Sequence, residues 1–161
     1  VIDGRGNLVR QVPSATPVAP GAAPSSVTGS AGDRSTAMAY DAANRLVLQV
    51  DALRGVTEQV LDADGHVVRR TQYASAIASV PPLGTSATAA AIRAAVTPDP
   101  AADRSERFGY DAAGRKVLTI DALGAVIETQ LDAAGHAVLQ TAYAKLVNTA
   151  GLAAAPSLAP M

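Results

Sequence analysis

Two stretches of the chain are nearly the same: residues 109–121 read GYDAAGRKVLTID, and residues 39–51 read AYDAANRLVLQVD. At an offset of 70 residues the similarity extends without a gap over 33–73 and 103–143, where over half of the positions are identical. Self-similarity at a fixed period is typical of repeat architectures. The sequence therefore predicts two copies of one structural unit, named block 1 (33–73) and block 2 (103–143).

Within each block, aspartate recurs every ten or eleven residues. The stretches DAAGR, DALGA and DAAGH begin at Asp111, Asp121 and Asp132. The carboxylate of such an aspartate accepts hydrogen bonds from backbone amides further along, and glycine at the fourth position supplies the left-handed conformation that closes a short, bulged hairpin. Each aspartate is predicted to open a turn. The corresponding residues of block 1 are Asp41, Asp51 and Asp62.

Two substitutions in block 1 test this interpretation. Asn44 stands where block 2 has Gly114, and asparagine is the non-glycine residue best tolerated at positive φ. Arg54 stands where block 2 has Gly124, but Gly55 follows at once. We expect the permissive residue of this turn to have moved by one place, to Gly55.

Short runs rich in β-branched and aliphatic residues lie between the turns, for example RLVLQV at 45–50 and AVIETQL at 125–131. Their length and composition are typical of strands. Each block is therefore predicted to be a meander of about four strands. The fold expected is mainly β: tandem antiparallel hairpins whose blocks stack into a ribbon, shell or fibre, and one of the inserts carries a short helix. Stacking is expected because a few strands poor in aromatic residues cannot bury enough surface alone.

The remaining segments differ from the blocks in composition. Residues 1–12 resemble the end of a preceding repeat, since Asp3, Gly6, Asn7 and Leu8 stand where Asp62, Gly65, His66 and Val67 stand later. Residues 13–32 are rich in Pro, Gly and Ser and are expected to be a linker with little regular structure. Residues 144–161 begin like the insert between the blocks. We expect the array to continue on both sides.

The insert between the blocks, residues 74–102, is rich in alanine and contains a predicted short helix over 87–96. Ser86 is the predicted N-cap, and Pro98 follows the helix end. Ala89, Ile92 and Val96 would form a narrow apolar stripe that packs on the sheet.

Composition excludes several classes of function. The 161 residues carry a formal net charge of −1, so no nucleic-acid surface is expected. The chain has no cysteine, hence no disulfide or thiolate metal site. No apolar run approaches the length of about 20 residues that a membrane span needs.

The search for chemistry yields no catalytic, cofactor or metal site, and we expect no enzyme. His66 and His136 are equivalent positions one repeat apart, which is not the spacing of metal ligands. The stretch DADG at 62–65 is similar to the start of a calcium loop but lacks the distal glutamate. Arg45 and Arg115 are expected to bridge to Glu58 and Glu128, or to the turn aspartate of an adjacent strand.

The string YDAAGR, with RF before it and a strand after it, resembles the YD repeat of RHS proteins. These are large bacterial repeat proteins related to the shell-forming components of insecticidal toxin complexes and to animal teneurins. Tyr110, Asp111, Gly114 and Arg115 match the motif, and Asn44 departs from it. The resemblance covers both blocks and residues 1–11. It implies a ribbon of hairpins that spirals into a shell or tube, at the cell surface or secreted.

The function expected is that of a structural segment in a large extracellular or cell-surface scaffold, a fibre, tube or shell. Its partners would be neighbouring repeats of the same chain or identical chains. Two alternatives stay open: an adhesive module whose strand faces or inserts bind polysaccharide or a partner cell, and part of a cocoon around a toxin cargo. The four tyrosines are expected to pack between neighbouring hairpins, and a row of exposed rings that binds sugar is the alternative to packing. The residues expected to build the repeat are Tyr40, Asp41, Asn44, Arg45, Asp51, Asp62, Gly65 and Tyr73 in block 1, and Tyr110, Asp111, Gly114, Arg115, Asp121, Gly124, Asp132, Gly135 and Tyr143 in block 2.

Overall fold

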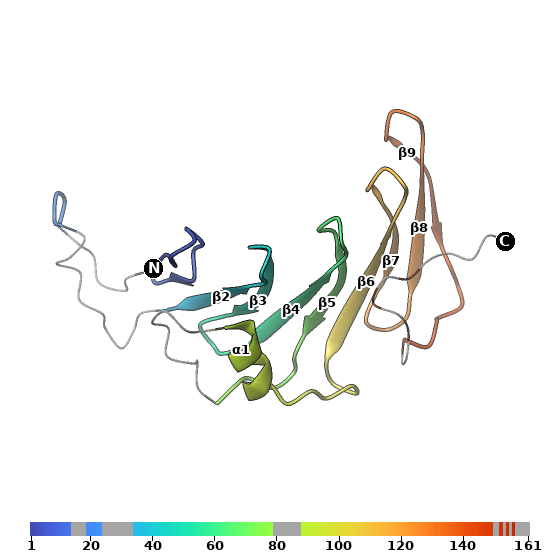
Figure 1. Cartoon of the computed structure of the whole chain (residues 1–161). Coiled ribbons are helices and arrows are strands. Elements are labelled where there is room, and N and C mark those ends of the chain that lie inside the picture. Colours follow the sequence, from blue (N-terminus) through green and yellow to red (C-terminus); the bar gives the residue numbers. More distant parts are fainter. Residues whose placement is uncertain are drawn as a thin grey trace. The chain divides into compact units, whose positions relative to one another are not determined.

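The structure, a computed structural model, describes residues 1–13, 19–23, 34–78 and 88–149, together with 152, 154 and 156. These residues form nine strands and one short helix, so the prediction of a mainly β fold is confirmed (Figure 1). Sheet neighbours follow chain order from β1 to β9, and the pairs are antiparallel. Most of the predicted linker at 13–32 lies outside the described residues.

The chain divides into two compact units. The first comprises Val1–Val56 and Ala76–Thr97, and the second comprises Thr57–Ser75 and Pro98–Met161. The first holds β1 (Arg10–Gln11), β2 (Thr36–Tyr40), β3 (Leu46–Val50), the first residue of β4 (Val56–Leu61), and helix α1 (Ala89–Ala95). The second holds the rest of β4, then β5 (Val67–Gln72), β6 (Arg104–Tyr110), β7 (Lys116–Ile120), β8 (Val126–Leu131) and β9 (Ala137–Ala142).

The two sequence blocks have four strands each, and the bounds agree for three of the four pairs, while β6 begins two positions earlier than β2. The pairs β3 and β7, β4 and β8, and β5 and β9 begin and end 70 residues apart. The register shifts also coincide: one lies just before Tyr40 and just before Tyr110, and another lies just before Leu61 and just before Leu131. Equivalent sequence thus gives equivalent hairpins, down to the position of each bulge.

In the first unit, alternate residues of neighbouring strands are buried. Ala37 and Ala39 of β2 and Val50 of β3 are almost inaccessible, as expected for strand residues that share one face. Helix α1 lies beside β3 and contributes Ile92, which is fully buried (Figure 1). Of the predicted apolar stripe, Ala89 and Val96 are half-buried.

Helix α1 begins later than predicted. Its N-cap is Thr88, whose hydroxyl oxygen accepts a hydrogen bond from the amide of Ala91 at 3.2 Å. The predicted N-cap, Ser86, lies outside the described residues. The reason is geometric: a capping oxygen satisfies an amide two or three residues ahead, and a helix beginning at Ala89 places Thr88 at that distance.

In the second unit, the core is a cluster of Leu118, Ile120 and Val126, with Tyr143 and Leu152 packed against it. The first three residues are the block 2 equivalents of Leu48, Val50 and Val56, which are buried in the first unit. The same strand positions therefore supply the core residues in both units.

The insert between the blocks begins and ends at one carboxylate. Asp103 accepts hydrogen bonds from the amides of Ala74 and Asp99, both at 2.8 Å. Because the two ends are held together there, β5 and β6 pair directly although the insert separates them in sequence. No helix among the described residues is long and apolar enough to cross a membrane.

Candidate functional site

Seven turns opened by aspartate share one pattern of hydrogen bonds. In the turn at Asp111, the Asp111 amide donates to the carbonyl of Arg115, the Gly114 amide donates to the carbonyl of Asp111, and the Arg115 amide donates to Oδ1 of Asp111, at 3.0, 2.9 and 2.9 Å. One carboxylate thus replaces the partners that the turn's backbone amides lack. The same three bonds occur at Asp3, Asp41, Asp51, Asp62, Asp121 and Asp132.

The fourth residue of each of these turns has a positive φ. The predicted glycines at 65, 114, 124 and 135 have this conformation, and so does Asn44 at φ 62°, which confirms the prediction for that residue. The prediction for Gly55 was wrong, because Arg54 itself adopts φ 70°. The reason is that Asp51 Oδ1 accepts from the amides of Leu53 and Gly55, which fixes the left-handed residue at position 54.

In five turns the side chain of the fifth residue contacts Oδ2 of the aspartate, and in the first of them Asn7 donates through Nδ2 to Asp3 at 3.1 Å. Arg45 and Arg115 donate through Nε to Oδ2 of Asp41 and Asp111 at 2.8 and 2.7 Å. His66 and His136 place Nδ1 at 3.0 and 3.1 Å from Oδ2 of Asp62 and Asp132. Of the two partners predicted for Arg115, the structure has the turn aspartate, Asp111, and not Glu128, because the turn brings residues i and i+4 side by side and offers a nearer carboxylate.

These bonds lower the pKa of five turn aspartates: Asp3, Asp41, Asp62, Asp111 and Asp132. At Asp41 and Asp111 the largest cause is the backbone amide of the fifth residue, and its guanidinium adds to the effect. At Asp62, burial acts to raise the pKa, but hydrogen bonds from His66 outweigh it and the pKa is lowered. The ionised carboxylate is therefore the form that the turns select.

A second recurrent feature joins one hairpin to the next. The hydroxyl of Tyr110 donates to the carbonyl of Val67 at 2.9 Å, and that of Tyr40 donates to the carbonyl of Leu8 at 3.0 Å. Strand registers agree as well: Arg69 pairs with Arg107 across β5 and β6, and Arg10 pairs with Ala37 across β1 and β2. This set of contacts, named the hairpin joint, occurs once in each unit.

Each hairpin joint also contains a matched pair of side chains. In the second unit the ring of His66 stacks on Tyr110 at 4.6 Å, and a Cβ added at Gly114 would lie 2.8 Å from His66 Nε2. In the first unit the equivalent residues are Asn7 and Asn44, whose side-chain amides form a hydrogen bond of 3.2 Å. Glycine therefore makes room for histidine, and asparagine bonds to asparagine. Sequence reasoning missed this pairing, although the two positions change together between the joints.

The other two tyrosines, Tyr73 and Tyr143, donate hydrogen bonds to glutamates. Tyr73 donates to Oε2 of Glu58 at 2.5 Å, and Tyr143 donates to Oε2 of Glu128 at 2.6 Å. Burial and the Glu58 carboxylate raise the pKa of Tyr73 to about 12. The hydrogen bond to Glu128 raises the pKa of Tyr143. The sequence had suggested packing for these rings, and the hydroxyl bonds were missed.

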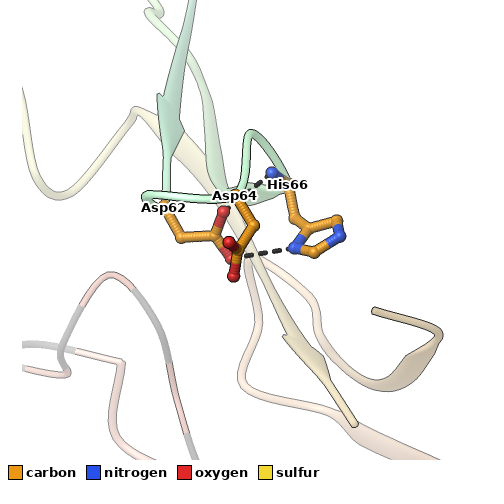
Figure 2. A group of neighbouring side chains, drawn as sticks. All are labelled: Asp62, Asp64 and His66. Carbon is orange, nitrogen blue, oxygen red and sulfur yellow. Dashed lines mark hydrogen bonds and ion pairs between the residues drawn. The ribbon is translucent and has the colours of Figure 1, made fainter. Parts of the chain in front are cut away.

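One turn brings together three groups of the kind that bind metals. Ligand atoms of Asp62, Asp64 and His66 lie within 4.8 Å of one another, and Figure 2 shows the two carboxylates on the same side of the turn. Asp62 is already hydrogen-bonded to both the amide and the ring of His66. Calcium takes six to eight oxygen ligands, and the equivalent turn of block 2 has Ala134 in place of Asp64. The turn itself accounts for this arrangement.

No protein-family model matches the chain, and no curated protein matches it at a significant level. The geometry therefore carries the interpretation. The repeated residues bond to one another within turns and across hairpin joints, where they fix backbone conformation and strand register.

Proposed function

We propose that this chain is a structural repeat segment of a large extracellular or cell-surface scaffold of the RHS type, which forms a fibre, tube or shell. The extracellular location rests on the resemblance of YDAAGR to the YD motif. The partners are further repeats, in the same chain or in identical chains.

The observation that carries this proposal is the hairpin joint. The same tyrosine-to-carbonyl bond and the same strand register occur between β1 and β2 and between β5 and β6. In repeat proteins each unit contacts its neighbours through one standard interface, and length is gained by repeating that interface. A joint that is used twice with the same contacts supports such a role.

The tyrosines argue against a platform that binds sugar. All four rings are half-buried, and all four hydroxyls donate hydrogen bonds within the protein, at distances between 2.5 and 3.0 Å. A sugar-binding platform needs exposed rings with free polar groups. The four rings therefore favour packing over sugar binding, and the adhesive alternative is left to the strand faces and the inserts. A cocoon around a cargo is a special case of the scaffold.

Electron cryomicroscopy of the native material tests the proposal. We expect a continuous ribbon of strands about 4.8 Å apart that extends past two blocks along one axis. Isolated two-block particles that bind a polysaccharide on a glycan array would overturn it and favour the adhesive alternative.

A further inference from the structure

The last strand, β9, has an outer edge that its equivalent in block 1 does not have. β5 pairs with β4 on one side and with β6 on the other. β9 pairs with β8 and ends the strand order, so among the described residues no strand pairs with its second edge. An open edge of this kind presents unpaired backbone donors and acceptors to another strand.

Identical residues show what is uncovered at this edge. Val68 of β5 is 5% exposed, and Val138 of β9 is 63% exposed. The side chain of His66 is 30% exposed, and that of His136 is 78% exposed. The residue types and strand positions are the same, and β5 pairs with β6 where β9 has no strand among the described residues, so we attribute much of the difference to a strand in the position of β6.

We infer that the outer edge of β9 is a docking site for the leading hairpin of another repeat block, one equivalent to β6 and β7. The inference deepens the proposed function, on which it rests. In the incoming hairpin a tyrosine equivalent to Tyr110 donates its hydroxyl to the carbonyl of Ala137, as Tyr110 does to Val67, and its ring stacks on His136.

The edge also selects among blocks. His136, like His66, favours a residue without a side chain at the fourth position of the incoming turn, because a Cβ at Gly114 would lie 2.8 Å from Nε2 of His66 and the ring would have to move. Asparagine at that position suits Asn7, to which Asn44 bonds at 3.2 Å. The preferred partner of β9 is therefore a block with a YDxxG turn, as in block 2, and a YDxxN turn is disfavoured.

A hydroxyl pair adds to this joint. Thr71 of β5 and Ser105 of β6 bond through their side-chain oxygens at 2.9 Å. Thr141 stands in β9 where Thr71 stands in β5, and it is more exposed than Thr71. A block that begins Asp-Arg-Ser, as both blocks of this chain do, presents the serine that Thr141 needs.

The first test uses the whole chain, labelled with ¹⁵N, and a synthetic peptide of residues 103–121. We expect NMR shift changes confined to residues 136–142, with the His136 ring protons moved upfield by the tyrosine ring. The peptide of residues 33–51, which carries Asn44, is the matched control and should bind at least about tenfold more weakly. Equal binding of the two peptides, or shift changes elsewhere, would overturn the inference.

An isolated hairpin peptide is only marginally stable in water. A second experiment therefore attaches the incoming hairpin to the chain itself. In a tandem chain, residues 1–143 are followed by 74–161, which adds a third block. Amides of 139–142 should exchange at least about tenfold more slowly than in the 161-residue chain, and Gly→Asn at the third block's equivalent of Gly114 should reverse most of this protection. Unchanged exchange in the tandem chain would refute the docking site.

The two proposals fail separately. If the native material forms a continuous ribbon while the tandem chain leaves β9 unprotected, the scaffold stands and the docking site is wrong. If the tandem chain protects β9 but the native material is not a ribbon, the docking chemistry stands and the scaffold is wrong.

Discussion

Each aspartate turn requires positive φ at its fourth residue, and this position is occupied by glycine, asparagine or arginine. Glycine adopts positive φ freely, asparagine adopts it at some cost, and arginine at a higher one. Asn44 is compensated by its bond to Asn7, and Arg54 by the bond from its Nη1 to the carbonyl of Ala78 at 2.7 Å. The departures from glycine therefore coincide with contacts that glycine cannot make.

Arg54 gives the first prediction. Arg54→Ala removes the bond to Ala78 and keeps a Cβ at φ 70°, whereas Arg54→Gly removes both. We expect the glycine variant to be more stable than the alanine variant by about 0.5–1 kcal/mol, after allowance for the greater entropy of glycine in the unfolded chain. Urea denaturation measures the difference. An alanine variant as stable as the glycine variant would show that the turn does not impose this conformation.

The pair of His66 and Gly114 gives the second prediction. Gly114→Asn alone places a side chain against the His66 ring, and His66→Asn alone removes the stacking on Tyr110. The double variant recreates the pair found at Asn7 and Asn44. We expect a favourable coupling of about 1 kcal/mol in a double-mutant cycle. Additive effects of the two substitutions would mean that the residues are not matched.

At the scale of elements, the hydrogen-bond pattern of the turns places the strands. Runs of β-branched residues predicted the strands, and the spacing of aspartate and glycine predicted the turns between them, because both signals are local. Contacts between hairpins were not predictable in this way. The Tyr110 bond to Val67 and the Tyr73 bond to Glu58 depend on strand register across the sheet, which one sequence does not specify.

The position of Arg54 shows a different limit of sequence reasoning. A neighbouring glycine was taken as the permissive residue, but the amides that bond to Asp51 fix the count of residues from the aspartate. The hydrogen bonds to Asp51 therefore decide which residue is left-handed, against the preference of arginine for negative φ. The free-energy cost of this conformation is similar in size to the contribution of one good hydrogen bond.

The turn aspartates predict acid sensitivity. Their pKa values are lowered in the folded protein at Asp3, Asp41, Asp62, Asp111 and Asp132. A lowered folded-state pKa stabilises the protein above the unfolded value of about 3.9, and this stabilisation is lost as the pH falls through the folded values. The urea midpoint should therefore decrease between pH 5 and pH 3.

Asp111→Asn is the control for the acid prediction. Asparagine keeps an acceptor oxygen for the turn amides and removes the titrating group. The variant should be less stable than the parent at neutral pH and should lose less stability on acidification. A midpoint that is the same at pH 5 and pH 3 in the parent would contradict the assignment.

The two tyrosine–glutamate bonds form a matched pair. Glu58 is 8% exposed, whereas Glu128 is only half-buried. Because a hydrogen bond to a buried carboxylate is worth more than one near solvent, Tyr73→Phe should destabilise the protein by about 1.5–3 kcal/mol and Tyr143→Phe by less. Thermal or urea denaturation compares them. A larger effect at Tyr143 would contradict this ranking.

At the scale of the whole molecule, the proposed scaffold depends on how its repeats are joined. Stability in a repeat array is a sum over units and their nearest-neighbour interfaces. Here the sequence blocks and the units defined by contacts do not coincide, because the division falls within β4, between Val56 and Thr57. The insert that follows block 1 explains this: the Ile77 amide donates to the carbonyl of Arg54 at 3.1 Å, and Ile77 is buried with the first unit.

The most direct test is residue-resolved amide hydrogen exchange on the 161-residue chain, comparing β5 with β9. The sequences and turns are equivalent, so a difference isolates the effect of a strand on the outer edge. We predict slow exchange at residues 69–72, where β5 pairs with β6, and exchange at least about tenfold faster for the outer-edge amides of residues 139–142. Equal protection of the two strands would contradict the central claim, which is that the hairpins are equivalent and that the outer edge of β9 is open to a further hairpin.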